Sequence, residues 1–412
     1  MMKTKHILWV GIVALAAGGA VLYSASYFSG GFLLLGAAVL YIVAESQKKG
    51  TAGLKENLKR GRNALGIPLV GISAAIVLGA LIMAATGYDP IKGLGALFYG
   101  GLIKNWHISV LNATPLIFTG LAVAFAFNAG LFNIGAEGQY YVGAMAAVWL
   151  GVHLGFSAWV AIPLIFLIGG ALGASCNYIP AILKVKTGAH EVVTTMMFAY
   201  SIKYLTNIFI RANGGDPATS RHPYVTDPIL KSNWLPRFRD FLPDANYRLH
   251  IGILIAILVA LAVHYLLYRT KIGFEIRAVG LNPEAARTQG ISIGRNIVFA
   301  LLISGLLAGF SGVNQVLGLD HRMFENLNAG YGWNGIAVAL LAANNPIGVI
   351  FTALLWGSLD AGGQYMARTE QIPNSIVEII KGIILFLILA KYIYSSMGHR
   401  IKSYLKRGGA TT

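Results

Sequence analysis

Charged side chains are scarce in this sequence. Of its 412 residues, only 12% are Asp, Glu, Lys or Arg, whereas 56% are hydrophobic. Soluble domains carry roughly 25% charged residues, so the chain has about half of the charge that covers an ordinary water-exposed surface. The deficit is explained if lipid covers most of the exterior, and it excludes a typical soluble domain.

Several kinds of chemical site are also missing. Cys176 is the only cysteine and lies in an apolar run, which excludes an intrachain disulfide and a multi-cysteine metal site and leaves packing as its expected role. No G-x-x-x-x-G-K-[ST] occurs, so the chain has no P-loop for nucleotide phosphates. The patterns H-E-x-x-H and G-x-S-x-G and a metal-spaced His/Cys set are absent too. We therefore expect no catalytic residue, no metal site and no cofactor bound by this chain.

Long apolar runs are present instead. The run from Ile251 to Leu267 contains one polar residue, His264, and a helix of this length crosses roughly 30 Å of hydrocarbon. Strand-type alternation is absent, so helices must satisfy the backbone within the bilayer. The sequence predicts an all-α polytopic membrane protein with spans near 7–23, 28–44, 66–86, 108–128, 138–154, 156–176, 191–210, 249–268, 297–317, 331–344, 346–362 and 373–392.

The distribution of charge orients these spans. Twelve crossings place both termini on one side, and the segments on that side hold 20 of the 32 Lys and Arg residues but only four acidic residues. Basic loops remain cytoplasmic, so we expect a multi-pass protein of the cytoplasmic membrane with both termini inside the cell. The net charge of +16 is thus a topology signal, and we expect no nucleic-acid partner.

A basic linker divides the chain. It runs from Glu45 to Gly66 and carries six Lys and Arg residues. We expect residues 1–63 to form an accessory transmembrane hairpin with its cytoplasmic linker, and residues 64–412 to form the main transmembrane domain. The first apolar stretch also has the form of a secretory signal, but a second span follows closely, which favours an uncleaved hairpin.

Two apolar stretches are interrupted by glycine and polar residues. They are Asn128 to Gln139 (NAGLFNIGAEGQ) and Gly330 to Pro346 (GYGWNGIAVALLAANNP). Irregular backbone at membrane depth is tolerated only where protein buries it or where it lines a wet cavity. One interrupted segment in each half of the chain indicates a translocation route. Glycines within other runs, such as Gly173 and Gly309, predict closely packed helices.

Acidic residues near membrane depth are the next candidates. A carboxylate at the bilayer centre costs about 2.5–3.5 kcal/mol, so Glu137 requires partners. Either it belongs to a pore-lining or gate cluster, or it stabilises a helix start from the first turn. Glu191 opens another helix, with Thr194 on the same face, and the same two interpretations apply. Glu378 and Lys381 are spaced to neutralise each other on one helix face. The polar neighbours of Glu137 are Asn128, Asn133 and Gln139.

A short cytoplasmic segment, Arg277 to Gly290 (RAVGLNPEAARTQG), has strong helix signals. Asn282 is a favoured N-cap, Pro283 fits the first helical position and Glu284 suits the first turn. Gly290 supplies the stop. The segment predicts a capped helix of about two turns, which either docks another protein or is a well-capped surface loop.

Four separated motifs in order resemble one family of proteins. ATPLIFTGLAVAFAFNAGLFNIGAEGQ (Ala113 to Gln139), HEVVTTMM (His190 to Met197), RAVGLNPEAARTQGI (Arg277 to Ile291) and GYGWNGIAVALLAANNPIG (Gly330 to Gly348) are similar to stretches in permeases of the branched-chain amino acid, ribose and nucleoside ABC importers. The form N-I-G-A-E-G-Q most resembles the nucleoside branch associated with basic membrane lipoproteins. His190, the pair Trp333-Asn334 and the pair Ala342-Ala343 depart from the family pattern.

This resemblance implies a fold and site residues. The fold would be a ten-helix core of the type II importer kind with broken helices, to which the N-terminal hairpin is an addition. The helix that meets the ATPase would include Gly280, Asn282, Glu284, Ala285, Ala286 and Gly290. The substrate pathway would include Asn128, Asn133, Glu137, Gln139, Glu191, Thr194 and Asn334.

The resemblance also implies a function and partners. The chain would be a permease subunit that moves nucleosides inward by alternating access, without ATPase activity of its own. Its partners would be a separate, fused double ATPase that uses the ATP, a second related permease and an external substrate-binding lipoprotein. Ribose or other sugars and branched-chain amino acids are competing substrates. A proton-coupled transporter that uses Glu137, His190 or Glu191, and a membrane scaffold, are alternatives of other classes.

Overall fold

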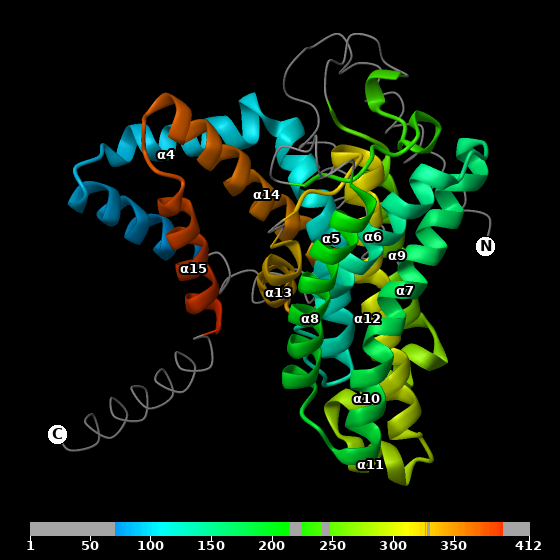
Figure 1. The fold of residues 1–412 in the computed structure, drawn as a ribbon. Coiled ribbons are helices and arrows are strands. Elements are labelled where there is room, and N and C mark those ends of the chain that lie inside the picture. The colour runs from blue at the N-terminus through cyan, green and yellow to red at the C-terminus, as the bar shows by residue number, and fades with distance from the viewer. Residues whose placement is uncertain (1–70, 215–223, 241–247, 326, 328–329, 390–412) are drawn as a thin grey trace, which may run out of the picture. The chain divides into compact units, whose positions relative to one another are not determined.

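Long apolar helices dominate the structure. The computed structural model describes residues 71–214, 224–240, 248–325, 327 and 330–389 (Figure 1). Five helices of this part are long and apolar enough to cross a membrane: α5 (Trp106–Asn128), α7 (Ala158–Thr187), α9 (Gly252–Arg269), α12 (Ile293–Gln315) with a π-helical extension to Asp320, and α14 (Pro346–Thr369). The expected all-α class is confirmed, whereas the ten-helix core stays a prediction. The hairpin expected at residues 1–63 lies outside the described residues.

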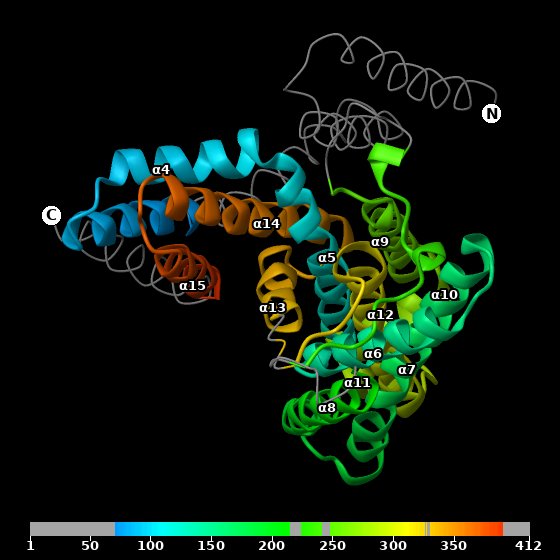
Figure 2. The same ribbon diagram turned by 45° about the horizontal axis from the view of Figure 1, so that its top comes forward.

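The described chain forms two compact units, and the larger comprises residues 107–358. Within it α12 lies side by side with α7 and α6 (Ala136–His153) in both views (Figure 1, Figure 2). A Cβ added at Gly173 would lie 2.5 Å from the carbonyl oxygen of Gly305 and 2.9 Å from the Cα of Gly309. Backbone therefore packs directly on backbone between α7 and α12, as the glycines within the apolar runs predicted.

The two ends of this unit differ in structure. At one end lie α10 (Lys271–Leu281) and α11 (Pro283–Thr288), and at the other lies the segment 224–240 (Figure 1). The Nδ2 of Asn233 donates to the carbonyl oxygens of Gly151 and Leu154, each at 2.9 Å. Arg211 in α8 (Glu191–Asn213) forms an ion pair with Glu325. The bonds of Asn233 therefore fasten the segment 224–240 to the C-terminal end of α6.

The smaller unit contains a helix that the sequence analysis missed. This unit includes the helix Gly71–Ala85, α4 (Pro90–Phe98), the π-helical η1 (Tyr99–Lys104), α14 from Leu359 onward and α15 (Ser375–Leu389). The spans expected at 66–86 and 108–128 left residues 87–107 outside any helix, whereas the structure forms α4 and η1 there. Asp89 caps α4, because its Oδ1 accepts hydrogen bonds from the backbone nitrogens of Ile91 (2.9 Å) and Lys92 (3.2 Å). Pro90 stands at the first helical position, where it suits a helix start.

The segment expected to cross the membrane at 331–344 is also shorter than expected. Its helix, α13 (Tyr331–Leu341), has 11 residues. At 1.5 Å per residue it spans about 17 Å, which is too short for a full crossing. Ala343 and Asn344 have φ angles of 48° and 59°, and this left-handed turn ends α13 before Pro346 begins α14. The expected crossing at 331–344 is therefore a half-helix.

A buried lysine joins two helices of the smaller unit. The Nζ of Lys381 contacts the Oδ1 of Asp360 and lies 3.0 Å from the Oε1 of Glu378. The Lys381 side chain is only 4% exposed. The expected Glu378–Lys381 pair is confirmed, and Asp360 is a further partner that links α15 to α14.

We expect Lys381→Met to lower the free energy of unfolding by about 3–5 kcal/mol, since it leaves a half-buried carboxylate without its cation. Denaturant titration of the purified protein measures this loss. Lys92→Met is the matched control, because its side chain is 70% exposed and 4.0 Å from Asp89. The control is expected to cost less than about 1 kcal/mol. Equal losses in the two variants would contradict this account of the cluster.

Candidate functional site

The first interruption is a buried turn with a polar network. Asn133 and Gln139 are 0% and 2% exposed. The Nδ2 of Asn133 donates to the Oε1 of Gln139 (2.9 Å) and to the Oγ of Ser304 on α12 (2.8 Å). The Nε2 of Gln139 donates to the Oδ1 of Asn177 on α7 at 2.6 Å. The two predicted pathway residues thus connect α6 to α7 and α12, and their side chains have bonded partners on those helices.

Glu137 bonds to the start of the second interruption. Its Oε1 accepts a hydrogen bond from the backbone nitrogen of Gly330 (2.8 Å) and its Oε2 one from Gly332 (2.6 Å). These amides lie at the N-terminus of α13, where a helix favours a negative charge. Glu137 is 4% exposed and is itself in the first turn of α6. Its carboxylate therefore lies between two helix N-termini, which accounts for an acidic group at a buried position.

Asn128 holds the other end of the half-helix. Its Nδ2 donates to the carbonyl oxygen of Asn344 (3.0 Å), in the turn after α13, and to that of Ala124 (2.8 Å). The two interruptions, about 200 residues apart in the sequence, thus meet at both ends of α13. Asn334 lies within α13, where its Oδ1 accepts a hydrogen bond from the Nε1 of Trp356 at 3.1 Å.

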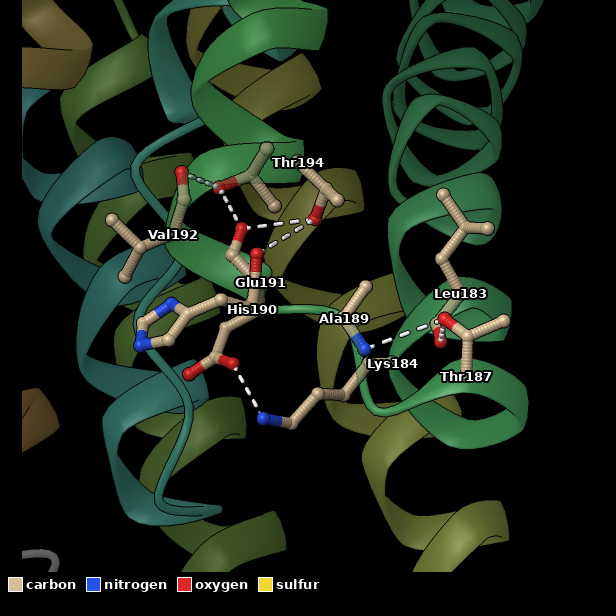
Figure 3. Close-up of polar contacts among 9 residues, drawn as sticks. Leu183, Lys184, Thr187, Ala189, His190, Glu191, Val192 and Thr194 are labelled. Carbon is tan, nitrogen blue, oxygen red and sulfur yellow. Dashed lines mark hydrogen bonds and ion pairs between the residues drawn. The ribbon is translucent and has the colours of Figure 1, made fainter.

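Glu191 is paired with a lysine from the preceding helix. Figure 3 shows its carboxylate pointing toward Lys184, and the Lys184 Nζ lies 2.8 Å from the Glu191 Oε2. The Oγ1 of Thr194 donates to the carbonyl oxygen of Glu191 within α8 at 3.2 Å. The next residue, Thr195, accepts a hydrogen bond from the backbone nitrogen of Ile134 at 3.3 Å. The start of α8 therefore contacts the first interruption through Thr195.

The predicted cytoplasmic helix has the expected caps. The Oδ1 of Asn282 accepts a hydrogen bond from the backbone nitrogen of Ala285 at 3.1 Å, and Pro283 is the first residue of α11. Gly290 has a φ of +76°, which favours glycine. Ala286 packs inward at 4% exposure, whereas Glu284 and Ala285 are exposed. Leu281, just before the cap, is 88% exposed, so this end presents an apolar side chain among charged ones.

Backbone contact joins α10 to the first interruption. A Cβ at Gly280 would lie 2.3 Å from the carbonyl oxygen of Asn128 and 2.8 Å from the backbone nitrogen of Gly130. Only glycine allows this approach. Gly280 therefore brings α10, which leads into α11, into direct backbone contact with the turn that holds Asn128, and Asn128 in turn bonds to the turn after α13.

Charged groups fasten α10 to α12 near this contact. The Nδ2 of Asn296 and the Nη2 of Arg295 donate to the Oε2 of Glu275 at 3.4 Å and 2.7 Å. These hydrogen bonds lower the pKa of Glu275 from its ordinary value, so its carboxylate is ionised at neutral pH. The ion pair keeps α10 in register with α12.

Asn177, Ser304 and Lys184 belong to these networks but were not singled out from the sequence. Asn177 had a signal, because it is a polar residue inside an apolar run. Ser304 and Lys184 had none, since small hydroxyls and helix-end lysines are common. In the described part of the chain, no group of three or more His, Cys, Asp or Glu side chains is placed to hold a metal ion. The pathway role of the seven predicted residues stays a prediction.

Comparison with known proteins identifies the family. Residues 105–389 match the family described as branched-chain amino acid transport system / permease component. The chain is 36% identical over 329 residues to the guanosine ABC transporter permease protein NupP of Bacillus subtilis, covering 79% of this chain and 93% of NupP. It is 34% identical over 355 residues to the nucleoside ABC transporter permease protein NupB of Lactococcus lactis, covering 84% and 96%. It is 31% identical over 343 residues to the glucose ABC transporter permease protein TsgB13 of Haloferax volcanii, covering 80% and 88%. This chain therefore belongs to the branched-chain amino acid transport system permease family.

Proposed function

We propose that this chain is the permease subunit of an ATP-driven importer and that it carries nucleosides across the cytoplasmic membrane. The observation that carries the proposal is the identity of more than one third to the guanosine and nucleoside permeases over almost their whole length. The interrupted helices support a transport role, because half-helices that end inside a bundle characterise the substrate sites of many transporters.

A sugar is the second candidate solute. The glucose permease of Haloferax volcanii is 31% identical to this chain. This identity is only slightly lower than the 36% and 34% of the guanosine and nucleoside permeases. A nucleoside contains a ribose, so a route that accepts it must accommodate a sugar with several hydroxyl groups. The test must therefore distinguish recognition of the nucleoside base from recognition of the sugar.

The proposal includes three partner chains. A separate ATPase, fused as a double ATPase, would bind α11 and hydrolyse the ATP, since this sequence lacks a P-loop. A second, related permease would complete the route, and an external lipoprotein would deliver the solute. Both termini would lie in the cytoplasm, because the positive-inside rule places the basic end with α10 and α11 there.

The contacts within residues 107–358 suggest how α11 would move the route. Closure of the ATPases would displace α11 and, through Gly280, the turn at Asn128. Asn128 and Glu137 hold the two ends of α13, so this turn would shift the half-helix as a body. We infer that the solute passes beside α13. The route need bind it only weakly, because tight binding would slow release.

Uptake competition tests this proposal. The complete importer is reconstituted into vesicles with ATP at the ATPase side, and entry of labelled guanosine is measured. We expect an excess of unlabelled nucleosides to suppress the entry of labelled guanosine, whereas an excess of ribose, glucose or leucine is expected to leave it unchanged. An uncoupler is expected to leave uptake unchanged while ATP lasts.

Each contrary outcome identifies a rival. Suppression by glucose or ribose as strong as that by nucleosides would establish a sugar permease, and suppression by leucine an amino acid permease. Uptake that needs no ATP and stops with the uncoupler would establish a proton-coupled transporter. Assembly with the partner chains but no uptake of any solute would favour a scaffold.

A further inference from the structure

A groove lies between α7 and α12. Its volume is about 450 Å³. Tyr178, Ile182 and Val185 form its α7 wall, spaced along one helix face. The apolar residues of its α12 wall are Val298, Phe299 and Leu302. Apart from Arg295 and the hydroxyl of Tyr178, the lining side chains are apolar.

The groove has a cationic mouth at one end. Arg295 lines it in the first turn of α12, and its side chain is 71% exposed although one nitrogen bonds to Glu275. A guanidinium has five N–H donors, so the remaining donors are available to a second acceptor. Exposed Lys186 follows the wall residue Val185 in the last turn of α7. The mouth is therefore cationic, and the rest of the groove is apolar except for the hydroxyl of Tyr178.

The mouth lies at the end of the unit that is rich in basic residues. Residues 182–190 and 269–296 contain seven Lys and Arg residues but two acidic ones. The groove continues along α12 from Arg295 to Leu302, which is about 10 Å at 1.5 Å per residue. A phosphate at Arg295 would thus sit at headgroup level, with apolar wall below it. Arg is well suited to this role, because its planar fork matches phosphate oxygens.

We propose that this groove binds one anionic phospholipid of the cytoplasmic leaflet, with its phosphate on Arg295 and an acyl chain between α7 and α12. The match of a cationic mouth to an anionic headgroup and of an apolar groove to a hydrocarbon chain carries the proposal. The lipid phosphate would bind the N–H groups of Arg295 that Glu275 of α10 does not use. The proposal does not depend on which solute is transported.

Lipid retention measured by native mass spectrometry tests the proposal. The complete importer is purified from nanodiscs of mixed phosphatidylglycerol and phosphatidylethanolamine, and the lipids retained on each complex are counted. We expect Arg295→Gln to reduce the preference for phosphatidylglycerol about fivefold, the effect of roughly one basic side chain near an anionic surface. Val298→Trp, which fills the groove without a change of charge, is expected to remove the bound lipid.

Controls separate the possible sources of binding. Arg248→Gln removes an exposed arginine four residues before α9, at the other end of the bundle, and is expected to leave retention unchanged. Inorganic phosphate alone is expected not to displace the lipid, because the acyl chain contributes to binding.

Three results would overturn the proposal. One is equal retention of phosphatidylglycerol in the wild type and in Arg295→Gln. Another is displacement by inorganic phosphate, which would assign the mouth to a free anion. The third is loss of the second permease in Val298→Trp, which would assign the groove to a subunit interface.

Discussion

ATP-driven uptake is expected to fall at least tenfold when Glu284 is replaced by Lys and Ala285 by Trp. Both side chains are exposed on α11, whereas Ala286 packs inward, so the change alters the presented surface and not the helix core. Loss of one central contact in a protein interface costs about 2 kcal/mol or more, which weakens attachment roughly thirtyfold. Uptake of labelled guanosine by the reconstituted importer measures the effect.

The matched control places the same bulk elsewhere. Ser232→Trp alters an exposed residue of the segment 224–240, at the opposite end of the larger unit. We expect it to leave ATP hydrolysis and ATPase attachment at wild-type values. If the α11 variant folds and still imports the solute at the wild-type rate, α11 does not bind the motor.

Glu137→Ala is expected to lower the free energy of unfolding by about 3 kcal/mol or more. The change leaves the amides of Gly330 and Gly332 without their acceptor, and each buried donor without a partner costs about 1–3 kcal/mol. It also removes the negative charge from the N-terminus of α13. Denaturant titration measures stability, and uptake is expected to fall with it because α13 loses its anchor.

Glu137→Gln makes this prediction sharper. Its amide oxygen can accept one of the two hydrogen bonds, whereas its NH2 group faces the other donor. The free energy of unfolding of Glu137→Gln is therefore expected to lie between that of the wild type and that of Glu137→Ala. If Glu137→Ala stays within about 0.5 kcal/mol of the wild type but uptake is lost, Glu137 contacts the solute and does not fasten α13.

Local chemistry made part of this structure predictable from the sequence. Each cap of α11 depends on residues close to it in the sequence, so Asn282 and Pro283 at one end and Gly290 at the other were sufficient to place the helix. The same cap signal is present at Asp89 and Pro90, but the spans expected at 66–86 and 108–128 did not include this helix. The length of α13 was overestimated, because hydropathy does not show where Ala343 and Asn344 turn the backbone.

Contacts across the sequence could not be predicted. The interruptions were visible as glycine and polar residues within apolar runs, yet nothing local shows that Glu137 meets Gly330 and Gly332. Their hydrogen bonds join residues separated by more than 190 positions. The contact of Gly280 with the turn at Asn128 also joins residues far apart in the sequence, 152 positions from each other. The sequence thus indicated which residues carry unusual chemistry, and the fold supplied their partners.

The affinity of the ATPase for this permease in nanodiscs tests the central claim most directly. We predict that the dissociation constant of the variant Glu284→Lys/Ala285→Trp rises roughly thirtyfold over that of the wild type, whereas that of Ser232→Trp does not change. An unchanged dissociation constant in the folded α11 variant would contradict transmission of force from the motor through α11 and Gly280 to the half-helix α13.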